Sequence, residues 1–65
     1  MTDTKDLFDV IEVDIKTQAI RILARAKNER AAEGIEMSAI FRRGVETAFY
    51  VSVPAGKYQD GDILR

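Results

Sequence analysis

The sequence predicts a mainly α fold in which one short strand precedes two helices, assembled as an intertwined homodimer. Residues 10–16 alternate apolar and polar side chains with a period of two, which is typical of a strand with one buried face. From Thr17 the apolar residues recur at helical spacing, Gly34 interrupts them, and a second helical stripe starts at Ser38. A lone strand leaves its backbone hydrogen-bonding groups unsatisfied, so we expect a second copy of the chain to pair with it.

The composition limits both the size of the core and the chemistry available to the chain. A chain of 65 residues forms one small domain, for which a single core is marginal and oligomerisation adds stability. There is no cysteine and no histidine, which excludes disulfides and the usual zinc site, so we expect neither metal nor cofactor. No stretch approaches the ~20 apolar residues of a membrane span, and the N-terminus does not resemble a signal peptide. We therefore expect a cytoplasmic protein without a membrane partner.

Charge is distributed unevenly along the chain, although the formal net charge is only −1. Residues 1–15 contain five acidic residues and one lysine, whereas residues 16–30 contain five basic residues and one glutamate. Mixed charge of this kind is ordinary for a protein surface, and it neither favours nor excludes nucleic acid as a partner.

The strand is predicted over roughly residues 8–16. Ile11, Val13 and Ile15 face inward, because the opposite register would bury two acids beside a lysine. The outward positions are then Val10, Glu12, Asp14 and Lys16.

Both predicted helices have plausible boundary residues. Thr17 is a candidate N-cap for the first helix, and Gly34 suits the position just after its last turn. Ser38 is a candidate N-cap for the second helix, which ends at Pro54. Gly44 falls within the apolar stripe of that helix, which predicts a close approach of two helices in the dimer core. The predicted shared core is Ile11, Val13, Ile15, Ile20, Leu23, Ile40, Phe41, Val45, Ala48 and Phe49.

The pattern divides the chain into a flexible acidic N-terminus over 1–7, a folded domain over 8–53 and a C-terminal tail over 54–65. Two alternatives remain open near the C-terminus. Residues 50–53 are also compatible with a strand, which would form a hairpin around residues 54–56. The tail is either mobile or docks as a short strand through its apolar residues, Tyr58, Ile63 and Leu64.

The order strand, helix, glycine turn, helix resembles the ribbon-helix-helix family and, within it, the Arc-like and MetJ-like repressors. The resemblance rests on Val13-Asp14-Ile15 in the strand, on Glu33-Gly34 between the helices, and on residues 38–47 in the second helix. It implies an obligate dimer whose two strands form an antiparallel ribbon. Outward side chains of that ribbon would enter the major groove, while amides at the start of the second helix would bind a phosphate.

The resemblance also assigns candidate residues. Glu12, Asp14 and Lys16 occupy the positions that would contact bases, and Met37 and Ser38 stand at the phosphate-binding helix start. The family usually carries basic or amide residues on the outward ribbon, whereas this chain carries two acids there. The candidate nucleic-acid-binding residues are Glu12, Asp14, Lys16, Met37, Ser38, Arg42 and Arg43.

The function that the sequence predicts is that of a small DNA-binding transcriptional regulator, a repressor that binds double-stranded DNA as a homodimer. The alternative keeps the fold and replaces DNA with a basic protein partner, which the acidic N-terminal region would dock as an inhibitor, an antirepressor or a DNA mimic does. Catalysis is not expected, because the chain has neither histidine nor cysteine and no glycine-rich phosphate loop.

Overall fold

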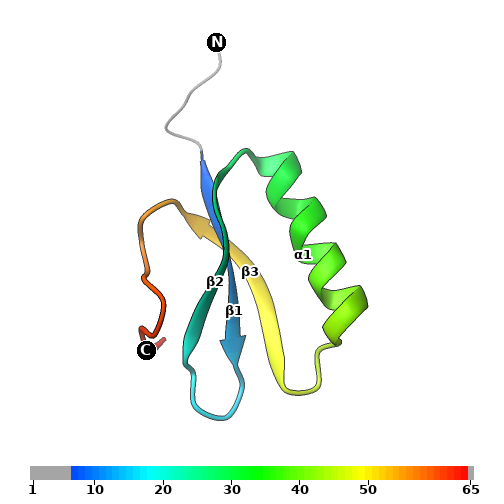
Figure 1. Ribbon diagram of the computed structural model, residues 1–65, viewed down its shortest axis with the longest axis vertical. Helices are drawn as coiled ribbons and strands as arrows, with labels where there is room; N and C mark the ends of the chain where they lie inside the picture. The colour runs from blue at the N-terminus through cyan, green and yellow to red at the C-terminus, as the bar shows by residue number, and fades with distance from the viewer. Residues whose placement is uncertain (1–6, 65) are drawn as a thin grey trace.

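The computed structural model describes residues 7–64 and arranges them in three layers. A sheet of three antiparallel strands lies in the middle, with strand order β2-β1-β3. The helix covers one face of this sheet, and residues 55–64, here called the C-terminal segment, lie against the other (Figure 1). The elements in chain order are β1 (Phe8–Asp14), β2 (Ile20–Lys27), α1 (Glu29–Arg43) and β3 (Ala48–Pro54).

This mixed α/β architecture shows that the predicted mainly α, ribbon-helix-helix fold is wrong. The predicted strand exists as β1, but it is the central strand, paired with β2 on one side and with β3 on the other. Both of its edges are therefore occupied within one chain. A second copy cannot pair with it, and the two-stranded ribbon of an intertwined dimer does not form.

Most of the predicted first helix is replaced by a turn followed by β2, while its last residues, 29–33, begin α1, which continues through Gly34. The Asp14 carboxylate accepts hydrogen bonds from the amides of Lys16 (2.8 Å) and Thr17 (3.0 Å), which reverses the chain directly after β1. Beyond the turn, Ile20 and Ile22 pack with the core on the side of the C-terminal segment, whereas Leu23 packs beneath α1. The alternation of period two thus prevails over the helical spacing, because pairing with β1 satisfies the backbone of both strands.

The predicted second helix is also split, and its boundaries move. Helix α1 begins after Asn28, whose side chain accepts a hydrogen bond from the Ala31 amide (2.8 Å). Ser38, the predicted N-cap, therefore lies in the middle of α1. The helix ends at Gly44, whose amide donates to the Ile40 carbonyl (2.8 Å) at a backbone φ of 76°. Gly44 thus terminates a helix and does not mark a crossing of two helices.

Gly34 and Gly44 lead to opposite predictions for the stability of the domain. Gly34 is inside α1 with open space where a Cβ would stand, so Gly34→Ala is expected to raise the free energy of unfolding by about 0.5–1 kcal/mol. Gly44→Ala is expected to lower it by about 1–3 kcal/mol, because the positive φ strains any L side chain. Urea titration followed by circular dichroism measures both changes. Equal effects of the two substitutions would contradict the assigned helix end.

The alternative strand over residues 50–53 is confirmed, with a different partner. It belongs to β3, which pairs with β1 and does not form a hairpin around residues 54–56. Because β1 is covered on both faces, Val10 is as fully buried as Ile11 and Val13, although the sequence placed it outward. Several predicted core residues are exposed instead: Ile15, Ile40, Phe41, Val45 and Phe49.

The C-terminal segment docks on the sheet, as the second of the two alternatives predicted, but it does so through an isolated bridge and not as a strand, and Pro54 belongs to β3. Tyr58 and Leu64 pack against the core cluster, while Ile63 forms an isolated bridge with Ala19. Backbone bonds also fasten the segment to the edge of β2, for example from the Ile20 amide to the Asp62 carbonyl (2.8 Å). The segment is therefore the third layer of the fold.

Candidate protein-interaction surface

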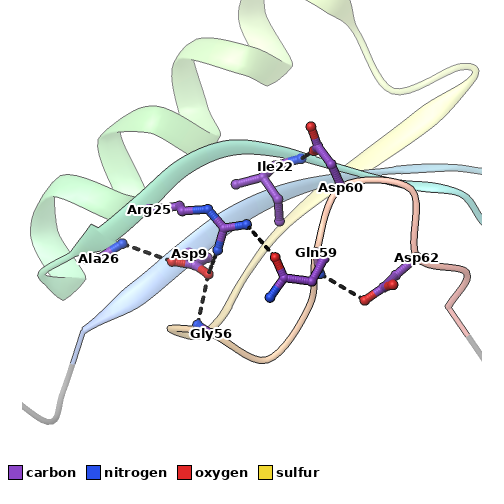
Figure 2. Close-up of polar contacts among 8 residues, drawn as sticks. All are labelled: Asp9, Ile22, Arg25, Ala26, Gly56, Gln59, Asp60 and Asp62. Carbon is purple, nitrogen blue, oxygen red and sulfur yellow. Dashed lines mark hydrogen bonds and ion pairs between the residues drawn. The ribbon is translucent and has the colours of Figure 1, made fainter.

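Several of the polar contacts that hold the C-terminal segment converge on one buried carboxylate, Asp9, while Asp60 contacts Ile22 separately (Figure 2). Asp9, only 1% exposed, accepts hydrogen bonds from the amides of Ala26 (2.9 Å) and Gly56 (2.9 Å), and Arg25 forms an ion pair with it (3.2 Å). Burial raises the pKa of Asp9, but the two amides and Arg25 outweigh that effect and hold the pKa below its ordinary value of 3.8. The Arg25 guanidinium also donates a hydrogen bond to the side-chain oxygen of Gln59 (3.2 Å). Every donor aimed at Asp9 belongs to the fold, so this cluster is structural.

The candidate base-contacting residues do not form a row on an exposed ribbon. Glu12 lies in the central strand, where its carboxylate is bracketed by Arg43 (3.2 Å) and Arg21 (3.9 Å) and its side chain is 17% exposed. Asp14 closes the turn after β1, and the Thr17 amide is the main cause of its lowered pKa. Lys16 lies in that turn. Two of the three candidates are thus engaged in holding the sheet together.

The candidate phosphate-binding residues are not at a helix start. Met37 and Ser38 lie near the middle of α1, where amides donate to the carbonyl groups of the preceding turn. Arg42 and Arg43 are in the last turn of the helix, where positive charge is favourable. Arg43 also joins that end of α1 to the sheet through Glu12.

The side of α1 that faces away from the sheet carries large apolar residues, which is the reverse of an ordinary amphipathic helix. Its buried residues are the small Ala32 and Ala39. Its exposed residues include Phe41, with 92% of its surface accessible, Met37 with 68% and Ile40 with 38%. We call Met37, Ile40 and Phe41 the helix patch. Exposed clusters of this kind mark binding surfaces, because each large side chain gains free energy when a partner removes it from water.

An acidic groove lies next to the helix patch, between the first half of α1 and β3. Its volume is about 210 Å³. The hydroxyl of Ser52 on β3 donates to the Glu36 carboxylate, so the groove borders directly on this strand. All of its charged lining residues are acidic. The lining consists of Phe8, Glu29, Ala32, Glu33, Glu36 and Ser52.

The sequence contains an indication of this surface, which the predicted helix from Ser38 to Pro54, with Ile40 and Phe41 in its core, concealed. Met37 and Phe41 are four residues apart and share one helix face, while Ala32 and Ala39 are seven apart and share the opposite face. Choosing the larger residues as the core is the usual assumption, and it placed Ile40 and Phe41 inside. Here the buried positions of α1 are alanines, with Ile35 and Glu36 half-buried beside them, so side-chain size does not identify the covered face.

Comparison with protein-family models, with curated proteins and with solved structures finds no match for this chain. The only helix in residues 7–64 lacks the length and the apolar character needed to span a membrane. Over the same residues, no group of three or more histidine, cysteine, aspartate or glutamate side chains is placed to hold a metal ion. The helix patch and the acidic groove are therefore the candidate functional surface of the described residues.

Proposed function

We propose that this chain is a non-enzymatic protein-interaction domain that binds a basic, partly apolar segment of another protein. One observation carries the proposal: exposed large apolar side chains on α1 stand beside a groove whose charged residues are all acidic. Apolar burial supplies the free energy of binding, and the carboxylates select a positively charged partner and raise the association rate.

The arrangement of the arginines supports the same proposal over DNA binding. Arg21 and Arg43 pair with Glu12, and Arg25 pairs with Asp9. Because each of these exposed guanidinium groups has a carboxylate partner within the chain, its charge is partly compensated before a phosphate could approach. The acidic residues proposed to bind the partner also differ from those that the sequence suggested. Glu12 and Asp14 serve the fold, and the acidic surface lies on the flank of α1.

Binding of designed peptides tests the proposed function. The probe is a fluorescent peptide of about ten residues in which lysine and valine alternate, long enough to span one strand. Its affinity is expected to exceed that of the matched glutamate–valine peptide by at least about tenfold, and also that of a lysine–serine peptide, which lacks the apolar side chains. Fluorescence anisotropy at low and high salt measures both differences.

Variants of the domain complete the experiment. Glu33→Gln combined with Glu36→Gln is expected to weaken binding of the lysine–valine peptide by about fivefold or more at low salt, and by less at high salt. Glu46→Gln in the loop before β3 removes the same type of charge outside the groove and is the matched control. Equal affinity for the basic and acidic peptides, or no effect of the double variant, would refute the proposed function.

A further inference from the structure

The two edges of the sheet differ in how far other segments of the chain cover them. The outer edge of β2 is partly covered, because the C-terminal segment makes backbone bonds to Ile20 at its start and to Gln18 just before it. At the other edge, within residues 7–64, β3 pairs only with β1. One side of β3 is therefore left without a neighbouring strand.

The backbone bonds at the two ends of β3 show which of its residues face that side. The Ile15 amide donates to the Thr47 carbonyl (2.9 Å), and the Ala55 amide donates to the Leu7 carbonyl (3.0 Å). The register between β1 and β3 is continuous from one end to the other. In an antiparallel pair only alternate residues exchange hydrogen bonds with the neighbour. The residues of β3 that bond to β1 are thus Phe49, Val51 and Val53. The alternate residues direct their backbone groups outward: Ala48, Tyr50, Ser52 and Pro54, of which Pro54 has no N–H.

This edge lacks the features by which proteins protect exposed strands. β3 is seven residues long, and its sequence, AFYVSVP, contains no charged side chain. Inward-pointing charges, lysines or bulges usually prevent unwanted pairing at an edge. Here only Pro54 stands in that role, at the last position of the strand. The rest of the edge is suited to accept an added strand.

We propose that the partner's basic segment binds as a fourth strand, antiparallel to β3 along this edge. The inference rests on the acidic groove of the proposed function and adds the manner of binding, in which the apolar side chains of the added strand face away from α1 and are buried beside Phe49 and not on the helix patch. Residues of the added strand that lie opposite Tyr50 and Ser52 point to the α1 side, where Glu33 and Glu36 flank the groove. The intervening residues point to the opposite side, next to Phe49, which is 37% exposed. The segment that fits therefore alternates basic and apolar side chains.

The same charges disfavour a second copy of the chain as the occupant. Antiparallel pairing of two β3 strands would place both helices on one face of a continuous sheet, related by a twofold axis. The acidic flanks of the two helices, each with Glu33 and Glu36, would then face one another. A basic segment meets the same carboxylates with the opposite charge.

A proline substitution tests the strand directly. Ser52→Pro removes an outward N–H while leaving the bonds to β1 intact, because Ser52 does not bond to β1. Its matched control is Ser52→Ala, which keeps that N–H and loses the same hydroxyl contact with Glu36. The lysine–valine peptide is expected to bind Ser52→Pro at least about tenfold more weakly than Ser52→Ala. Equal affinity of two folded variants would overturn the proposal.

N-methylated peptides give a second test that leaves the protein unchanged. In the proposed antiparallel arrangement the lysines face α1, so their amides donate to β3. N-methylation of the central lysines is expected to abolish binding, whereas N-methylation of the central valines retains it. Equal affinities of the two methylated peptides would overturn strand addition. If binding still required Glu33 and Glu36 in that case, the proposed function would stand alone.

Sedimentation equilibrium of the unliganded chain identifies the remaining occupant. We expect a monomer for both the native chain and Ser52→Pro. A native dimer that Ser52→Pro dissociates would assign this edge to a second copy and overturn the proposal.

Discussion

Asp9→Asn is expected to lower the free energy of unfolding by about 2–4 kcal/mol. Both carboxylate oxygens of Asp9 accept hydrogen bonds, one from the Ala26 amide and the other from the Gly56 amide and Arg25. An asparagine presents an NH₂ group to one of these donor sets and loses the ion pair. The total free energy of unfolding of a domain of this size is only about 3–5 kcal/mol. The variant is therefore expected to be largely unfolded or close to it.

The matched control for this substitution is Asp60→Asn. Asp60 accepts from the Ile22 amide (2.6 Å), but it is exposed, so water replaces what the substitution removes. Its expected cost is below about 1 kcal/mol. Urea denaturation of both variants measures the difference, and equal destabilisation would show that the buried carboxylate has no special role.

The pH dependence of stability, compared between the native chain and Asp9→Asn, checks that the charge of the Asp9 carboxylate is the cause. The pKa of Asp9 in the folded chain lies below 3.8, so its contribution to stability is present above that pH and is lost as the pH falls through the folded pKa. The gap in stability between the native chain and Asp9→Asn is thus expected to be constant above about pH 5 and to shrink below about pH 4. Asp14 also has a lowered pKa, but both proteins contain it, so it cancels. A gap that is independent of pH down to strongly acidic conditions would contradict this account.

Ending the chain at Pro54 is expected to unfold the domain. The truncation removes Tyr58 and Leu64 from the core cluster of Ile11, Val13 and Ile20. Loss of these two partly buried side chains corresponds to roughly 1.5–3 kcal/mol of apolar burial, and the truncation also removes the Gly56 amide from Asp9 and the backbone bonds to Ile20, which together approach the stability of a small domain. Far-UV circular dichroism and the dispersion of amide proton shifts measure the loss of structure.

The control for truncation is Ile63→Ala within the full-length chain. Ile63 is 46% exposed, so the expected cost is below about 1 kcal/mol. A truncated chain that unfolds cooperatively at an unchanged denaturant concentration would mean that the C-terminal segment is a dispensable tail.

Local patterns identified some parts of this fold correctly. The alternation of Ile11 and Val13 predicted a strand with a buried face, and both residues are fully buried in β1. The strand propensity of residues 50–53 was visible as an alternative, and so was docking of the C-terminal segment through Tyr58 and Leu64. Each of these signals depends on residues close together in sequence.

Other parts could not be predicted in the same way. Residues 20–27 fit a helical stripe as well as a strand, and the choice between them depended on β1 being available as a neighbour. For the same reason, the partners of β1 that were sought in a second chain proved to be β2 and β3, and β3 begins more than thirty residues after β1 ends. The candidate surface was missed because Phe41 and Ile40 were taken as core residues, an error that follows from judging burial by hydrophobicity alone.

Composition and periodicity therefore established a small domain without cysteine or histidine, built around a strand at Val13, and they offered residues 50–53 as an alternative strand, whereas residues 20–27 were assigned to a helix. Which strand pairs with which, which face of α1 is covered and which edge stays open were settled by contacts between distant residues. Those contacts depend on backbone hydrogen bonds between strands that are distant in sequence and on the packing of α1 against the sheet, and neither is encoded in any short stretch of the chain.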